Sequence, residues 1–150
     1  MPECTIRAFE SRDSEWLREW YEADQTGMAA VMGKPLPTAD DCVKAFQVIF
    51  QGVQAQQSQF WIVECDQEPL GFFVLTDIPP TQDVASVHVF IDPAQRRHSL
   101  RASRAFVGFC TAQGFQRLVV VTRSRAAHAL AKHVGFRPPV ANILTLTLPN

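Results

Sequence analysis

The chain has 150 residues, of which 47% are hydrophobic and 19% are charged, and its formal net charge is −1. Such a chain can bury a hydrophobic core, and its composition excludes disordered and fibrous proteins. Its apolar runs are too short to span a bilayer and its N-terminus lacks the pattern of a secretory signal. We therefore expect residues 1–150 to form a single domain in the cytoplasm.

The N-terminal part of the chain predicts one strand and two helices. Thr5–Phe9 alternates as a strand does, and Ser11 or Asp13 then caps a helix. Aromatic and apolar residues recur in that helix at helical spacing: Trp16, Leu17, Trp20 and Tyr21. This spacing favours a core face, with a wall of a substrate site as the alternative. After a loop at residues 33–37, a helix capped by Thr38 extends to about Gln57.

Three strands are predicted next. Gln59–Cys65 and Leu70–Thr76 form a hairpin around a turn at residues 66–69. Ala85–Ile91 alternates, with His88 and Phe90 on one face and Val87, Val89 and Ile91 on the other.

The C-terminal part predicts two more helices between strands. Arg97–Gln113 is a helix that stops at Gly114, and Gln116–Thr122 is a buried strand. Ser124 caps a helix at Arg125–Val134, and Asn142–Leu148 supplies the last strand.

Charge is distributed unevenly along the chain. No acidic residue follows Asp92, whereas nine arginines and lysines do, the first at Arg96 and the last at Arg137. The first turn of a helix presents backbone N–H groups and a positive dipole end, which suit a phosphate. We therefore expect an anion site at residues 97–102. We further expect its backbone amides to face a cleft beside a fourth strand that separates from its neighbour. The alternative is a chance distribution of charge over the surface.

The cysteines at positions 4, 42, 65 and 110 form no CxxC pair. This spacing excludes a structural zinc site, and we expect no metal. All four are expected to be free, buried thiols in a reducing compartment.

Residues 93–101 resemble the acetyl-CoA-binding motif of the GNAT superfamily, in which a Pro after the fourth strand precedes Arg or Gln, two residues, Gly, one residue, and Gly or Ala. Residues 114–118 are similar to the family's approach to its fifth strand, and Gly135-Phe136 to the end of its closing helix. The resemblance implies an α/β (α+β) fold, the acyl-CoA N-acyltransferase fold, with a central mixed, mostly antiparallel sheet and about four helices. It also implies acetyl-CoA as co-substrate, held by Val89, Phe90, Ile91, Arg96, Arg97, His98, Ser99, Leu100, Arg101 and Ala102.

The chain departs from the family at several positions. Ser99 and Arg101 replace the two glycines, and Ala131 stands where the family often has a Tyr general acid. His88 is the best candidate for the base by residue type, with a surface role as the alternative. Ser124 is expected to cap a helix or to order a water at the catalytic centre. Glu64 and Asp77 are weaker candidates for a base that acts through water.

Three functions follow as hypotheses. The first is an acetyl-CoA-dependent N-acetyltransferase that acts on a small amine or a protein amine by direct attack. The second is a catalytically inactive GNAT-fold structural or interaction protein, for example a component of a phage virion, in a homo-oligomer or a larger assembly. The third, nucleic-acid binding by an arginine stripe, ranks last because no recognition motif accompanies the stripe.

Overall fold

A computed structural model describes residues 4–121, 125–140 and 143–148. Within these residues the strands are β1 (Cys4–Ala8), β2 (Gln59–Cys65), β3 (Glu68–Thr76), β4 (Val84–Ile91), β5 (Arg117–Val121), β6 (Arg137–Val140) and β7 (Ile143–Thr147). The α-helices are α1 (Ser14–Ala23), α2 (Gln25–Met32), α3 (Ala39–Gln54), α4 (Ser99–Ala112) and α5 (Arg125–Val134), and short 3-10 helices lie at η1 (Ser11–Asp13) and η2 (Pro93–His98).

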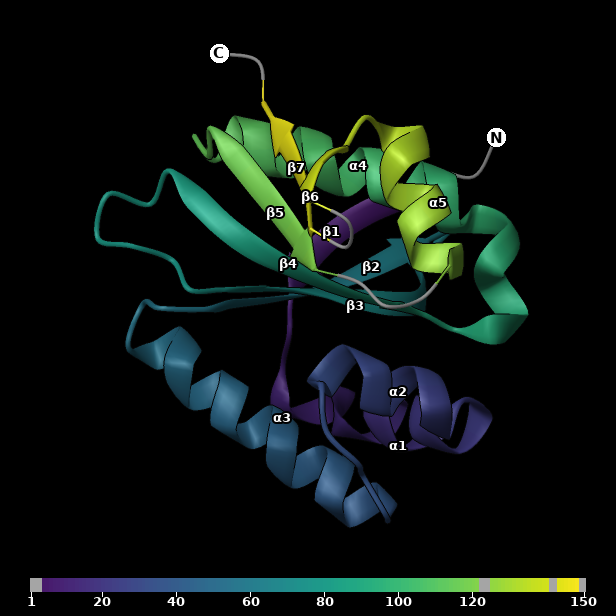
Figure 1. Cartoon of the computed structure of the whole chain (residues 1–150). Coiled ribbons are helices and arrows are strands. Elements are labelled where there is room, and N and C mark those ends of the chain that lie inside the picture. The colour runs from purple at the N-terminus through teal and green to yellow at the C-terminus, as the bar shows by residue number, and fades with distance from the viewer. Residues whose placement is uncertain (1–3, 122–124, 141–142, 149–150) are drawn as a thin grey trace.

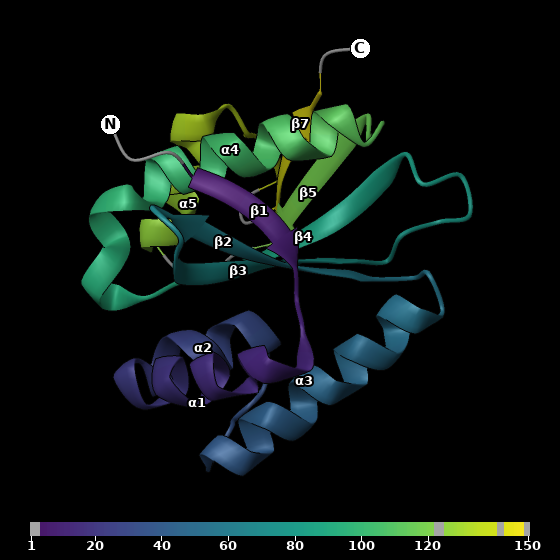
Figure 2. The same cartoon turned by 180° about the vertical axis from the view of Figure 1, so that it is seen from behind.

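The strands form one sheet in the order β1-β2-β3-β4-β5-β7-β6. Among the strands of the described residues, only β4 and β5 pair in parallel, and the other pairs are antiparallel. Helices α1, α2 and α3 cover one face of the sheet, and α4 and α5 cover the other (Figures 1 and 2). The predicted mixed, mostly antiparallel sheet with helices around it is confirmed.

Each face of the sheet has its own hydrophobic core. Under α1–α3 the core is aromatic and includes Trp20, Phe46, Phe72 and Phe90. Trp20 is 1% exposed and Tyr21 is 2% exposed, so the aromatic spacing in α1 marks a core face. On the other face, Phe106 of α4 stacks on Phe73 of β3 at 4.1 Å between ring centroids.

Local sequence explains most element boundaries. The Thr38 hydroxyl caps α3 by accepting the N–H of Asp41 at 3.1 Å. Asp66 and Gln67 both have positive φ, at 55° and 66°, which gives the β2–β3 hairpin a tight turn. Gly135 ends α5 with φ at 123°.

Two predictions about this part of the chain need correction. Helix α2 was not predicted, because Gly27 disfavours a helix and residues 28–32 form a continuous apolar run without helical spacing. The second correction concerns cysteines: Cys4 and Cys65 lie opposite each other on β1 and β2 and form a disulfide, so they are not free thiols. Cys42 and Cys110 are free and buried as expected.

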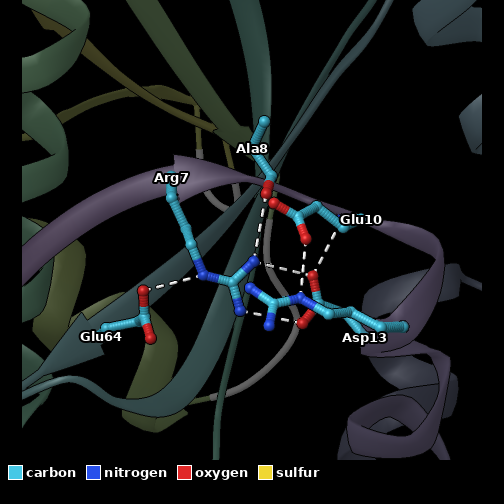
Figure 3. Close-up of polar contacts among 6 residues, drawn as sticks. Arg7, Ala8, Glu10, Asp13 and Glu64 are labelled. Atoms are coloured by element: carbon cyan, nitrogen blue, oxygen red, sulfur yellow. Dashed lines mark hydrogen bonds and ion pairs between the residues drawn. The ribbon is translucent and has the colours of Figure 1, made fainter.

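A buried ion pair fixes the start of α1 against the sheet (Figure 3). Arg7 of β1 donates at 2.8 Å to each carboxylate oxygen of Asp13, which is 2% exposed, and at 2.8 Å to Glu64 of β2. Asp13 also accepts the backbone N–H of Glu10. This pairing assigns Glu64 a structural role and sets the angle at which the chain leaves β1 for α1.

Candidate active site

The central feature of the candidate site is a gap between β4 and β5. Their parallel pairing covers Val84–Ser86 against Arg117–Val119, although β4 continues to Ile91 and β5 to Val121. The predicted separation of the fourth strand from its neighbour is therefore present.

The backbone of β4 has a defined orientation at this gap. The N–H of Asp92 bonds to the carbonyl of Leu70 on β3 at 2.7 Å. Because backbone groups alternate sides along a strand, those of His88 and Phe90 also face β3, whereas those of Val89 and Ile91 face the β5 side. Of the three β4 residues predicted to hold the co-substrate, Val89 and Ile91 thus direct backbone groups into the gap, and Phe90 does not.

An apolar cavity of about 50 Å³ lies next to the gap, on the side of the sheet covered by α4 and α5. Strand residues Val87, Val89, Leu118 and Val120 line it, together with helix residues Ser103, Phe106, Val107, Leu130, Ala131 and Val134 and the rings of Phe73 and Phe136. Ala131, which stands at the family's tyrosine position, is 7% exposed and forms part of this lining. The cavity is therefore apolar. Because Ala131 stands at the tyrosine position, that position provides no general acid to the cavity.

The anion site predicted from the sequence falls at the junction between η2 and α4. The Asp92 carboxylate accepts the N–H of Ala94 at 3.0 Å and so starts η2, which leads directly into α4. No side chain caps α4 and its first turn holds no acidic residue. Ser99 has φ −56° and ψ −45°, an ordinary helical conformation, so the backbone there does not require the glycine that the family uses.

The arginines at this junction are held in three different ways. Arg96 donates to Asp24 at 2.7 Å, and Arg97 donates to the carbonyl of Ala94 at 3.1 Å. Arg101 Nη2 lies 3.2 Å from Nδ1 of His98, so its guanidinium folds back along the first turn of α4. Arg101 therefore adds positive charge at the predicted anion site and is not among the residues that line the apolar cavity.

The other predicted residues of the junction have mixed exposure. Ser99 and Leu100 are half-buried, whereas Ala102 is fully buried in the core under α4. Ala102 can thus contribute only its backbone. Ser124, predicted to cap α5 or to order a water, lies outside the described residues.

His88 lies two residues beyond the last β4–β5 pair, on the α1–α3 face of the sheet with Phe90. Its Nε2 is 3.0 Å from the hydroxyl of Thr76 on β3. Burial lowers the pKa of His88, and the negative charge of Asp77 opposes that effect without reversing it. The imidazole is therefore neutral at pH 7, as a base must be.

Two residues of this region were missed by reasoning from sequence. Thr76 ends an ordinary strand, and only the register of β3 on β4 places it against His88. Asp24 contacts Arg96 from 72 positions away. Asp24 is the N-cap of α2, and because that helix was not predicted, no local pattern indicated a carboxylate of fixed orientation there.

Among the helices of the described residues, none is long and apolar enough to cross a membrane.

Comparison with solved structures shows the fold. An acetyltransferase from Salmonella typhimurium that modifies the N-terminal serine of ribosomal protein L7/L12 aligns with a TM-score of 0.79 and 14% identity, over 98% of this chain and 96% of that chain. Spermidine N-acetyltransferase from Vibrio cholerae, in complex with CoA and spermine, aligns with a TM-score of 0.79 and 13% identity, over 97% of this chain and 95% of that chain. Ribosomal-protein-S5-alanine acetyltransferase from Vibrio fischeri aligns with a TM-score of 0.75 and 12% identity, over 100% of this chain and 96% of that chain.

Comparison with curated proteins finds no match. The profile of the acetyltransferase (GNAT) family matches residues 9–136, which span the gap, the η2–α4 junction and α5. The GNAT family resemblance of the junction and of the closing Gly-Phe is thereby confirmed over most of the chain. This protein belongs to the acetyltransferase (GNAT) family.

Proposed function

We propose that this chain transfers the acetyl group of acetyl-CoA to an amine. The observation that carries the proposal is the gap between β4 and β5, where Val89 and Ile91 have no strand partner on β5 among the described residues. This gap leads to the basic junction of η2 with α4. Family membership supports the same reaction.

The residues present fit acetyl-CoA. The positive dipole end of α4 and the arginines at positions 96, 97 and 101 suit a pyrophosphate, although the N–H of Ser99 already donates to the carbonyl of Arg96. The apolar lining at Val87 and Val89 suits an uncharged arm. When bound, acetyl-CoA supplies a thioester whose acyl carbon forms an amide with the amine while the carbon–sulfur bond breaks and the thiol is released.

His88 has the proton-transfer role in this proposal. A protonated amine is no nucleophile, and a neutral imidazole accepts its proton before or during attack. The Thr76 hydroxyl holds Nε2 of His88 in one orientation. Backbone N–H groups of Val89 and Ile91 stabilise negative charge on the acyl oxygen. Ala131 has no proton to donate, so protonation of the thiol leaving group would rely on solvent.

The acceptor in this proposal is a cationic amine, either a small molecule or a protein N-terminus. Glu15, Glu19 and Glu22 form an exposed acidic surface on α1, on the face of the sheet where His88 lies. The solved structures with this fold include enzymes named for a ribosomal protein and for spermidine, which are amines of both kinds.

One observation favours a second function. Ala131 removes the family's usual acid from the cavity, which is consistent with a catalytically inactive structural or interaction protein, including the virion component considered from the sequence. Binding of acetyl-CoA without turnover would support that alternative.

The test combines binding with turnover. Calorimetry with acetyl-CoA is expected to give saturable binding that weakens about tenfold in Arg97→Glu, because a charge-assisted contact is lost. Arg117→Glu is the matched control. Arg117 of β5 is exposed and pairs with Val84, at the end of β4 that lies opposite η2. Thiol release against a panel of polyamines and peptide N-termini then measures transfer. Absence of binding by the unaltered chain would overturn the proposal.

A further inference from the structure

An ion pair joins the basic junction of η2 with α4 to a helix on the other face of the sheet. Arg96 of η2 donates to Oδ2 of Asp24 at 2.7 Å, and Asp24 precedes α2 as its N-cap. Both views place η2 beside the ends of α1 and α2 (Figures 1 and 2). Asp24 thus contributes a carboxylate to a junction whose own segment, from Pro93 onward, has no acidic residue.

The two oxygens of Asp24 have different tasks. Oδ1 accepts the N–H of Gly27 at 2.9 Å and so caps α2, while Oδ2 contacts Arg96. The Arg96 side chain is 57% exposed and that of Asp24 is 22% exposed, so the guanidinium can leave this contact without unfolding either element. The cap on α2 does not depend on Arg96.

We propose that Asp24 competes with the coenzyme phosphate for Arg96 and thereby sets the affinity of the coenzyme site. This inference rests on the proposed function. A guanidinium that donates a charge-assisted hydrogen bond to a carboxylate must break that bond before the same N–H can donate to a phosphate. The carboxylate also repels a phosphate that approaches the same guanidinium. Both effects weaken coenzyme binding, so the Asp24–Arg96 contact is autoinhibitory.

The experiment is a double-mutant cycle measured by calorimetry with coenzyme A on the full chain. Asp24→Asn removes the charge and retains a side chain that caps helices well, so α2 stays folded. We expect Asp24→Asn to bind coenzyme A about two- to fivefold more tightly, the range that corresponds to loss of an exposed ion pair. We expect Arg96→Ala to weaken binding, and Asp24→Asn to have no effect in the Arg96→Ala background.

Asp40→Asn is the matched control. Asp40 forms a comparable exposed ion pair with Arg18, at 2.7 Å on the helices α1 and α3, and its loss changes the net charge equally. Its coenzyme affinity should equal that of the unaltered chain.

Three results would overturn the inference: unchanged or weaker binding by Asp24→Asn, an equal gain in the Arg96→Ala background, or an equal gain in Asp40→Asn. Either of the last two results would show that the gain in affinity comes from the overall electrostatic field of the protein and not from Arg96. If the unaltered chain binds no coenzyme A, the proposed function fails and this inference fails with it. If it binds and the cycle shows no coupling, only this inference fails.

Discussion

Arg7 and Asp13 form a two-bond ion pair, with both bonds at 2.8 Å, across the bend that joins β1 to α1. Asp13 is 2% exposed and the Arg7 side chain is 24% exposed, so removal of the Asp13 charge leaves a partly buried guanidinium with one of its two carboxylate partners. We expect Asp13→Asn to lower the free energy of unfolding by about 3 kcal/mol, the lower end for a broken buried pair, since Arg7 keeps Glu64.

Chemical denaturation measures this effect. Arg12→Gln is the control, because Arg12 forms an ion pair with Glu10 in which its own side chain is 72% exposed, and a loss below about 1 kcal/mol is expected. Equal losses in the two variants would contradict a special role for the buried pair.

The same pair predicts how stability depends on pH. Burial alone raises the pKa of Asp13, but hydrogen bonds from Arg7 and from the Glu10 N–H, with the charge of Arg7, bring it below its ordinary value of 3.8. The unfolded chain therefore takes up this proton at a higher pH than the folded chain. The contribution of the Asp13 carboxylate to the free energy of unfolding is complete above pH 3.8, and it is lost as the pH falls through the lower pKa of the folded state.

Thermal or denaturant unfolding from about pH 5 down to about pH 2 tests this prediction, because the contribution is lost below pH 3.8. Asp13→Asn should show a shallower loss of stability on acidification than the unaltered chain, because it lacks the titrating group. Parallel curves for the two proteins would assign the acid sensitivity to other carboxylates.

His88 and Thr76 give a kinetic prediction. His88→Gln should lower kcat by about 10²- to 10⁴-fold, the usual contribution of a general base. Thr76→Val should lower kcat by a smaller factor, and Thr76→Ser should restore it, since serine keeps the hydroxyl that contacts Nε2.

The pH profile separates catalysis from folding. Burial lowers the pKa of His88, so the rate should be constant at neutral pH and fall only on acidification below the ordinary value of 6.5. This step should vanish in His88→Gln. If His88→Gln retains full activity, another group accepts the proton.

The disulfide predicts a count of reactive thiols. Cys4 and Cys65 are bonded, whereas Cys42 and Cys110 are free. Protein denatured without reductant should therefore react at two thiols, and reduced protein at four. Burial raises the pKa of Cys42 to about 11 and that of Cys110 to about 12, so both should react slowly with thiol reagents in the folded state. Four reactive thiols before reduction would refute the pairing.

Most elements of the fold were predictable because their signals are local. The alternation in β4, the cap at Thr38 and the stops at Gly114 and Gly135 each depend on residues a few positions apart. Helix α2 failed this test because its small residues carry a weak pattern, and it packs where α1 and β4 already provide a surface.

The candidate site divides in the same way. Its basic junction at residues 96–102 was visible in the sequence, since the arginines and the start of α4 are contiguous. The base and its partner were only half visible: His88 stood out by residue type, whereas Thr76 acquires its role from the register of β3 on β4.

The sequence by itself determined most of the elements in their order, although not α2 or β6. It also determined the family and the charge of the predicted anion site, because each is encoded in neighbouring residues. Only the tertiary structure decided that Cys4 meets Cys65, that Asp24 meets Arg96 and that β4 parts from β5 after Ser86. These relationships join residues far apart in the chain, and they arise from sheet register and helix packing, which no local pattern specifies.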